Sequence, residues 1–155
     1  MLDINIKGGS RSQRKYATSM IEFVANKFLS RMSYIKINLH IKDIKDDAYG
    51  YAIPSDCSDD ARPREFDIEV HSKLKLRKFL TTLAHEMVHV KQFAKGELYE
   101  STVQGKHRWH GQWLAKEPDY YDQPWEIEAA GREAGLFVRW AEKHKLGKHK
   151  WTWDD

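Results

Sequence analysis

Residues 82–92 constrain the fold most, because they place two histidines one helical turn apart inside an apolar run. Residues four apart share a face of an α-helix, so His85 and His89 can direct their imidazoles at one metal ion. Glu86 lies beside them, where a carboxylate can hold a water molecule and take its proton. The stretch therefore predicts a helix that carries part of a metal site.

The apolar residues of this run indicate which side of the helix is buried. They recur at the 3, 4, 7 spacing of an amphipathic helix. His85, His89 and Gln92 form a second stripe at the edge of that surface, where water can be excluded. The alternative is a structural protein whose two histidines are solvated or hydrogen-bonded and hold no metal. The apolar residues are Leu80, Leu83, Ala84, Met87 and Val88.

The length of 155 residues and a hydrophobic content of 41% predict one globular domain over residues 1–155. A strand or linker is expected at 1–12 and a basic, aromatic tail at 144–155. No apolar run approaches the roughly 20 residues of a membrane span, and the N-terminus lacks signal-peptide features, so we expect a cytoplasmic protein. The sequence does not indicate an oligomeric state.

Cys57 is the single cysteine, which excludes an intrachain disulfide and a cysteine-based zinc site. Any metal must therefore be held by histidine and carboxylate groups. The net charge of +3 does not by itself indicate a nucleic-acid partner. The stretch 143–153, which covers most of this tail, interleaves cations with aromatic side chains and could contact nucleic acid. A structural explanation, with the tryptophans packed back on the domain, is favoured.

Periodicity predicts an α+β fold in which an N-terminal helix packs on a small mixed β-sheet. The strand at 66–71 directly precedes the histidine helix, so we expect it to run beside the cleft and to pair with an extended peptide. A short apolar alternation at residues 2–6 begins the chain. The expected helices are 13–31, 76–94 and 124–143, and the expected strands are 35–42, 49–53 and 66–71.

Two connecting segments have no clear periodicity. Residues 54–63 are rich in turn formers and carry three aspartates, but they lack the spacing of a calcium loop and are expected to be a solvated connection. Residues 97–123 are expected to be irregular. Long insertions after such a helix often carry function, so this segment is the expected lid or specificity element.

A catalytic zinc site needs a third protein ligand and one open position. On the last helix, Glu126 borders the expected packed face, whereas Glu128 points toward Arg132 and solvent. We therefore predict Glu126 as the third ligand. The residues expected on this packed face are Ile127, Ala130, Ala134, Phe137, Val138 and Ala141. The other candidates are Glu128, His107, His110 and, less favoured, Asp119 and Asp122.

The sequence His85-Glu86-x-x-His89, followed by Glu126-Ile127-Glu128-Ala129, resembles gluzincin-type metallopeptidases, including HtpX-type and ImmA-type enzymes. Over about residues 66 to 142 the chain is also similar to small SprT-like or phage-encoded metallopeptidases. The resemblance implies a minimal zincin-like domain in which the histidine helix and a C-terminal helix supply the ligands. It again selects Glu126. Ala130 departs from the pattern, because these families usually place Asp or Asn there to support the ligand.

The resulting expectation is a zinc-dependent peptidase, of the endopeptidase kind, that cleaves a peptide or protein substrate. Zn2+ on His85, His89 and Glu126 would activate water, and Glu86 would be the general base. The SprT-like resemblance keeps a histidine as the runner-up third ligand. The alternative function is a catalytically weak zinc-containing binding or regulatory module, nucleic-acid associated as in SprT-like proteins. The candidate oxyanion or substrate residues are His107, His110, Tyr120 and Tyr121.

Overall fold

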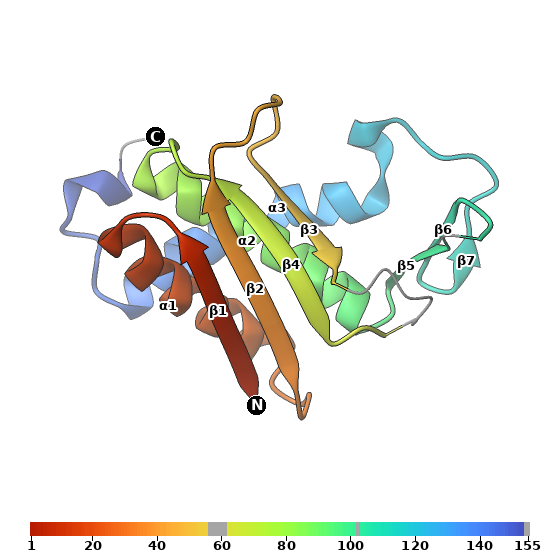
Figure 1. The fold of residues 1–155 in the computed structure, drawn as a ribbon, viewed down its shortest axis with the longest axis horizontal. Helices are drawn as coiled ribbons and strands as arrows, with labels where there is room; N and C mark the ends of the chain where they lie inside the picture. Colours follow the sequence, from red (N-terminus) through yellow and green to blue (C-terminus); the bar gives the residue numbers. More distant parts are fainter. Residues whose placement is uncertain (56–61, 102, 154–155) are drawn as a thin grey trace.

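A computed structural model describes residues 1–55, 62–101 and 103–153 of the chain (Figure 1). Three long helices and two sheets make up an α+β fold, as predicted. The helices are α1 (Arg11–Phe28), α2 (Leu76–Ala94) and α3 (Pro124–Lys143), with short 3-10 turns η1 (Tyr120–Asp122) and η2 (Lys150–Thr152). The strands are β1 (Leu2–Gly8), β2 (Ile35–Lys42), β3 (Gly50–Pro54), β4 (Glu65–His71), β5 (Leu98–Ser101), β6 (Lys106–Trp109) and β7 (Gln112–Trp113).

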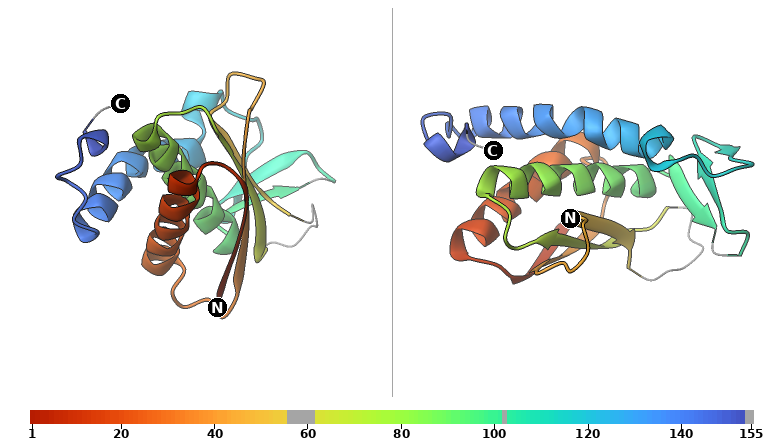
Figure 2. Two further views of the ribbon diagram at one scale, coloured as in Figure 1. Left: turned by 60° about the vertical axis from the view of Figure 1, so that its left-hand side comes forward. Right: turned by 90° about the horizontal axis from the view of Figure 1, so that it is seen from above.

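The main sheet has the strand order β1-β2-β4-β3. The first three of these strands are parallel, and β3 pairs antiparallel with β4 at the edge. Helices α1 and α2 cover one face of the sheet, and α3 packs on the far side of α2 (Figure 2). Helix α2 is therefore a middle layer between the sheet and α3, which is where a metal site shared by two helices has to lie.

Local sequence explains where the first elements begin. Ser10 caps α1 through a capping box, because its hydroxyl accepts from the Gln13 N–H and the Gln13 side chain accepts from the Ser10 N–H. The predicted helix at 13–31 is thus present, shifted toward the N-terminus by two to three residues. In β2, the alternation of apolar and polar residues is confirmed, because Ile35, Ile37 and the other odd-numbered apolar residues are buried against the helices.

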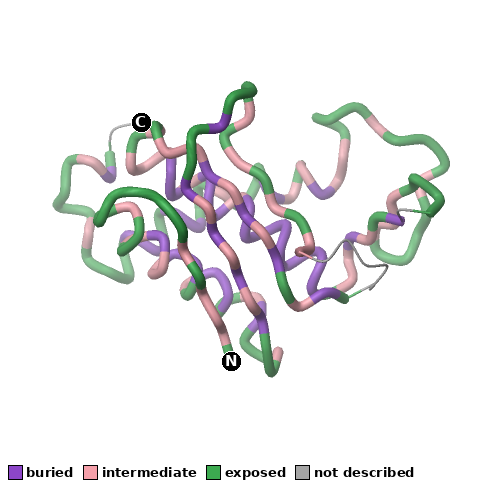
Figure 3. Tube along the Cα trace, viewed as in Figure 1, coloured by how far each residue is buried: buried purple, intermediate pink, exposed green. Residues whose placement is uncertain are grey.

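Helix α2 has the predicted bounds and is buried on nearly all sides (Figure 3). The five residues of its predicted apolar stripe are fully buried. The second predicted stripe also lies inside the molecule, since Gln92 is fully buried and His89 is 7% exposed. No helix in the described part of the chain is long and apolar enough to cross a membrane.

Two predictions about strands are wrong. Strand β4 is not beside the cleft as a free edge, because β2 and β3 pair with it on both sides. The edge strand next to β4 is β3, which the short run at 49–53 predicted only weakly, and β1 forms the other edge. Segment 97–123 is not irregular either, since its described residues contain the three-stranded sheet β5-β6-β7. Strands of two to four residues are too short to show a period of two.

The predicted packed face of α3 is also partly wrong. Ile127 is 57% exposed and Val138 is 46% exposed, whereas Trp125 and Trp140 are buried. The two tryptophans determine the orientation of the helix, because they bury the largest apolar surface. The buried residues are Trp125, Ala129, Leu136, Phe137, Trp140 and Ala141.

The tail packs back on the domain, as the structural explanation predicted. Trp151 lies 5.2 Å from the Tyr16 ring and 6.3 Å from the Trp140 ring, measured between ring centroids. The guanidinium of Arg77 also donates to the Thr152 carbonyl at 2.7 Å. Most of the predicted solvated connection at 54–63, including its three aspartates, lies outside the described residues.

Candidate metal centre

Three side chains from α2 and α3 converge between the two helices. Nε2 of His85 lies 3.2 Å from Oε2 of Glu126, and Nε2 of His89 lies 2.8 Å from Oε1 of the same carboxylate. One ligand atom from each of the three residues fits within a span of 4.8 Å. The structure thus brings together the two histidines of the motif and the glutamate that the sequence favoured as the third ligand.

These positions suit a small metal ion of tetrahedral preference. Zinc takes nitrogen and oxygen ligands at about 2.0 to 2.2 Å, so two ligand atoms in a tetrahedral site lie roughly 3.3 Å apart. The two nitrogen–oxygen separations in the site are already close to that value. Two imidazoles and one carboxylate also form the donor set of many catalytic zinc sites. The two separations involve different oxygens of Glu126 and the three ligand atoms span up to 4.8 Å, so the side chains would draw closer together to hold a metal ion such as zinc.

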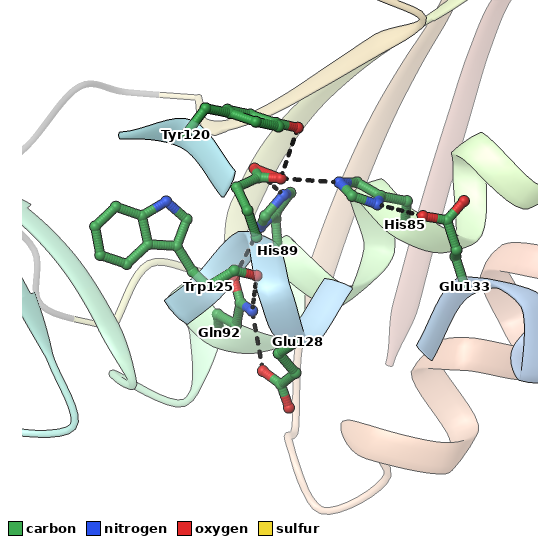
Figure 4. Close-up of polar contacts among 8 residues, drawn as sticks. His85, His89, Gln92, Tyr120, Trp125, Glu128 and Glu133 are labelled. Carbon is green, nitrogen blue, oxygen red and sulfur yellow. Dashed lines mark hydrogen bonds and ion pairs between the residues drawn. The ribbon is translucent and has the colours of Figure 1, made fainter. Parts of the chain in front are cut away.

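The back of each imidazole is held by a second hydrogen bond (Figure 4). Nδ1 of His85 lies 3.1 Å from Oε1 of Glu133, and Nδ1 of His89 lies 2.8 Å from Oε1 of Gln92. An ionised carboxylate can only accept, so His85 Nδ1 is the donor. The Gln92 amide NH2 donates to the Trp125 carbonyl and to Glu128, both at 2.9 Å, so its oxygen accepts from His89. Both Nε2 atoms are directed at the Glu126 carboxylate, to which they donate in the metal-free protein, and a metal ion would take the place of these protons.

Glu133 supplies the support that the sequence lacks at Ala130. It lies seven residues after Glu126, two turns along the same face of α3, whereas Ala130 is exposed. Sequence reasoning did not identify Glu133. The signal available was this seven-residue spacing, which predicts a shared face but does not reveal that α2 passes close enough for contact.

The charges of the three ligands are strongly coupled. Burial disfavours the imidazolium of His85, but hydrogen bonds to Glu126 and Glu133 outweigh it and raise the pKa of His85 to about 10. Burial disfavours the imidazolium of His89 as well, but the hydrogen bond to Glu126 helps to outweigh this effect, so the pKa of His89 is also raised. Burial disfavours the charged form of Glu126, yet the two histidines hold the pKa of that carboxyl well below its usual range. A divalent cation would replace the imidazole protons as the partner of this carboxylate.

Glu86, the predicted base, is 5% exposed. Burial raises the pKa of Glu86 to about 7, against the opposing effect of His89 and His85. Strand β3 passes over this residue at Gly50, where an added Cβ would lie 3.4 Å from the Glu86 Cγ and 3.1 Å from the Thr82 Cγ2. Glycine therefore lets the edge strand approach the base closely. Sequence reasoning did not single out Gly50.

Glu128 is not the solvated residue that was predicted. It contacts Arg132 at 3.0 Å as expected, but it also accepts from buried Lys91 at 2.7 Å and from Gln92. Burial disfavours the charged form of Glu128, but these donors outweigh burial and lower its pKa to about 2, and Lys91 has the largest effect among the donors. Glu128 thus belongs to the scaffold behind His89.

The four candidate oxyanion or substrate residues have different surroundings. The Tyr120 hydroxyl donates to Oε2 of Glu126 at 2.9 Å (Figure 4), and Tyr121 is 87% exposed. Burial and the Glu126 carboxylate raise the pKa of Tyr120, which stays a neutral donor. His107 stacks on Trp125 and lies 3.3 Å from Glu117, and His110 lies in the turn between β6 and β7. Of the four, Tyr120 is the one whose side chain hydrogen-bonds to a candidate metal ligand in the described part of the chain.

A cleft of about 490 Å³ opens beside His85, Glu126 and Glu133. A larger hollow of about 670 Å³ lies on the open face of the main sheet but contains none of the three ligands. The smaller cleft is therefore the one relevant to chemistry at the metal centre. Its other lining residues are Tyr49, Lys78, Thr82, Tyr120, Tyr121, Ile127 and Ala130.

The assignment of a function depends on this geometry alone. Comparison of the chain with known protein families, with curated proteins and with solved structures finds no match.

Proposed function

We propose that the chain is a zinc-dependent peptidase that cleaves a peptide or protein substrate by hydrolysis. The observation that carries the proposal is the convergence of His85, His89 and Glu126 next to a buried carboxylate, Glu86. Two histidines and a glutamate leave an open position on a four-coordinate ion. A structural site, by contrast, would use four protein ligands and would need no base beside it.

The edge strand β3 is the proposed binding surface for the substrate backbone. It ends the strand order of the main sheet, so its outer backbone groups have no strand partner in the described sheet. Tyr49, directly before β3, lines the cleft beside His85. An extended peptide that pairs with this edge would be held along the cleft, with its amide groups presented to the metal centre.

Glu86 is the proposed general base. When bound, a zinc ion supplies Lewis acidity to the attacking water and to the scissile carbonyl. Glu86 then accepts the proton of that water and returns it to the leaving amine. In the metal-free protein, burial raises the pKa of Glu86 to about 7; a bound cation would lower this pKa and so favour the carboxylate that accepts the proton.

Tyr120 is the proposed donor to the developing oxyanion. Its hydroxyl lies 2.9 Å from the carboxylate of Glu126 and remains protonated at neutral pH, as a donor must. When Glu126 binds a metal, its carboxylate becomes a weaker acceptor, so the Tyr120 hydroxyl can turn to the substrate oxygen.

Cleavage of a peptide library by zinc-loaded protein tests this function, with Glu86→Gln as the matched variant. Glutamine preserves the shape of the side chain but cannot accept the proton. We expect one zinc per chain in both proteins and a rate reduced by about 100-fold or more in Glu86→Gln. Equal cleavage by both proteins would refute the role of Glu86. Zinc binding without cleavage by either would favour the alternative of a binding or regulatory module.

A further inference from the structure

The charged residues of this chain are unevenly distributed. Segments 10–19, 72–84 and 143–153 contain eleven of the 26 Lys and Arg residues and none of the 23 Asp and Glu residues. The rest of the chain therefore carries fifteen basic residues against 23 acidic ones. A small positive net charge thus conceals a basic part and an acidic part of the same molecule.

The fold brings these three segments together at one end of the molecule. The Gln13 side chain of α1 donates to the Ser72 carbonyl at 2.9 Å, which joins the first segment to the second. Arg77 donates to the Thr152 carbonyl at 2.7 Å, which joins the second to the third. Figures 1 and 2 show the beginnings of α1 and α2 and the C-terminal residues at the end opposite to the β5-β6-β7 sheet. We call this region, formed by the three segments, the basic end.

Each segment contributes exposed cations to the basic end. Arg11, Lys75 and Lys148 are exposed examples, one from each segment. The large apolar side chains between them are mostly turned inward, because Trp151 packs on Tyr16 and Phe137. The aromatic residues of the tail therefore build the scaffold, and the lysines that alternate with them remain in water. The tail can therefore pack on the domain through its aromatic residues and still present its lysines to a partner.

We propose that the basic end binds the phosphate backbone of a nucleic acid. Clustered cations attract a regularly spaced polyanion and release its counterions, and of the cations in the three segments Lys73 lies near a carboxylate, that of Asp43 at 3.5 Å. An anionic membrane would need apolar side chains to insert among the cations. Of the large apolar residues in the three segments, only Trp153 is substantially exposed, at 71%, which suits stacking on one base better than membrane insertion.

Binding of the full-length chain to fluorescent 20-nucleotide single strands and 20-base-pair duplexes, measured by anisotropy over a series of salt concentrations, tests the proposal. The test variant reverses one exposed cation in each segment: Arg11→Glu, Lys75→Glu and Lys148→Glu. The control reverses three exposed lysines elsewhere, Lys45→Glu, Lys106→Glu and Lys116→Glu, and changes the net charge equally.

We expect affinity that falls steeply with salt and weakens at least about 10-fold in the test variant, with a salt slope reduced by about 2 to 3 for duplex. The control variant should stay within about 3-fold of the unmodified protein. Equal losses in both variants, or no binding of either oligonucleotide at low salt, would overturn the proposal. Binding to vesicles that contain phosphatidylserine, without binding to oligonucleotides, would overturn it in favour of a membrane surface. Unchanged circular dichroism of the variants shows that the comparison concerns folded protein.

Discussion

Replacement of Glu133 by alanine should weaken zinc binding without removing any ligand. The carboxylate lies 3.1 Å from Nδ1 of His85 and is 24% exposed at the side chain. It fixes the tautomer that leaves Nε2 for the metal and increases the basicity of that nitrogen. Loss of such a partner typically reduces metal affinity by about 10- to 100-fold, or roughly 1.4 to 2.8 kcal/mol.

Competition with a chromophoric chelator at pH 7 measures the zinc affinity of Glu133→Ala directly. The matched control is Glu142→Ala on the same helix, where the carboxylate is 61% exposed and pairs with Arg139 at 3.2 Å. Glu133→Gln keeps an oxygen acceptor but loses the charge, so its zinc affinity should lie between those of Glu133→Ala and Glu142→Ala. Zinc affinity of Glu133→Ala within about 3-fold of the unmodified protein would refute the positioning role of Glu133.

Three further predictions concern the same site. Gln92→Leu removes the side-chain donor to the Trp125 carbonyl and the acceptor for Nδ1 of buried His89, and should lower the free energy of unfolding by about 1 to 3 kcal/mol, measured by urea denaturation. Zinc affinity should rise with pH, because zinc must displace imidazole protons. The pKa of His85 is raised to about 10, so the paired imidazolium stabilises the metal-free protein fully below pH 6.5. This stabilisation is lost as the pH rises toward 10. Thermal melts of metal-free protein should show that loss, and melts of zinc-loaded protein should not. Gly50→Ala adds a Cβ 2.8 Å from the Glu69 carbonyl oxygen and should displace β3, lowering peptidase activity by about 10- to 100-fold while zinc still binds; unchanged activity would contradict a role for this approach.

The parts of the site that could be predicted are those fixed by local geometry. The spacing of His85 and His89 within one helix determines that they share a face, whatever the rest of the fold. The same holds for the bounds of α2, whose apolar period is sustained over its whole length. Glu126 was favoured partly for an incorrect reason, since the packed face of α3 is set by its tryptophans and not by Ile127 and Val138.

The parts that could not be predicted depend on how elements meet. Glu133 reaches His85, and Gly50 allows β3 to approach Glu86, only because α3 and β3 lie on opposite sides of α2. Lys91 and Glu128 would ordinarily be assigned to a solvated surface, but they form a partly buried ion pair behind Gln92. The spacing of these two residues in the sequence does not predict this contact between helices.

Zinc affinity of Glu126→Ala tests the central claim most directly, because Glu126 is the ligand that the helix spacing alone does not determine. The matched control is His107→Ala, the rival ligand, whose ring stacks on Trp125 and pairs with Glu117. We predict one zinc per chain in the unmodified protein and in His107→Ala, with X-ray absorption indicating two imidazole ligands. Glu126→Ala should lose most of its zinc affinity. Tight zinc binding by Glu126→Ala would contradict the account. So would a loss of zinc binding in His107→Ala but not in Glu126→Ala.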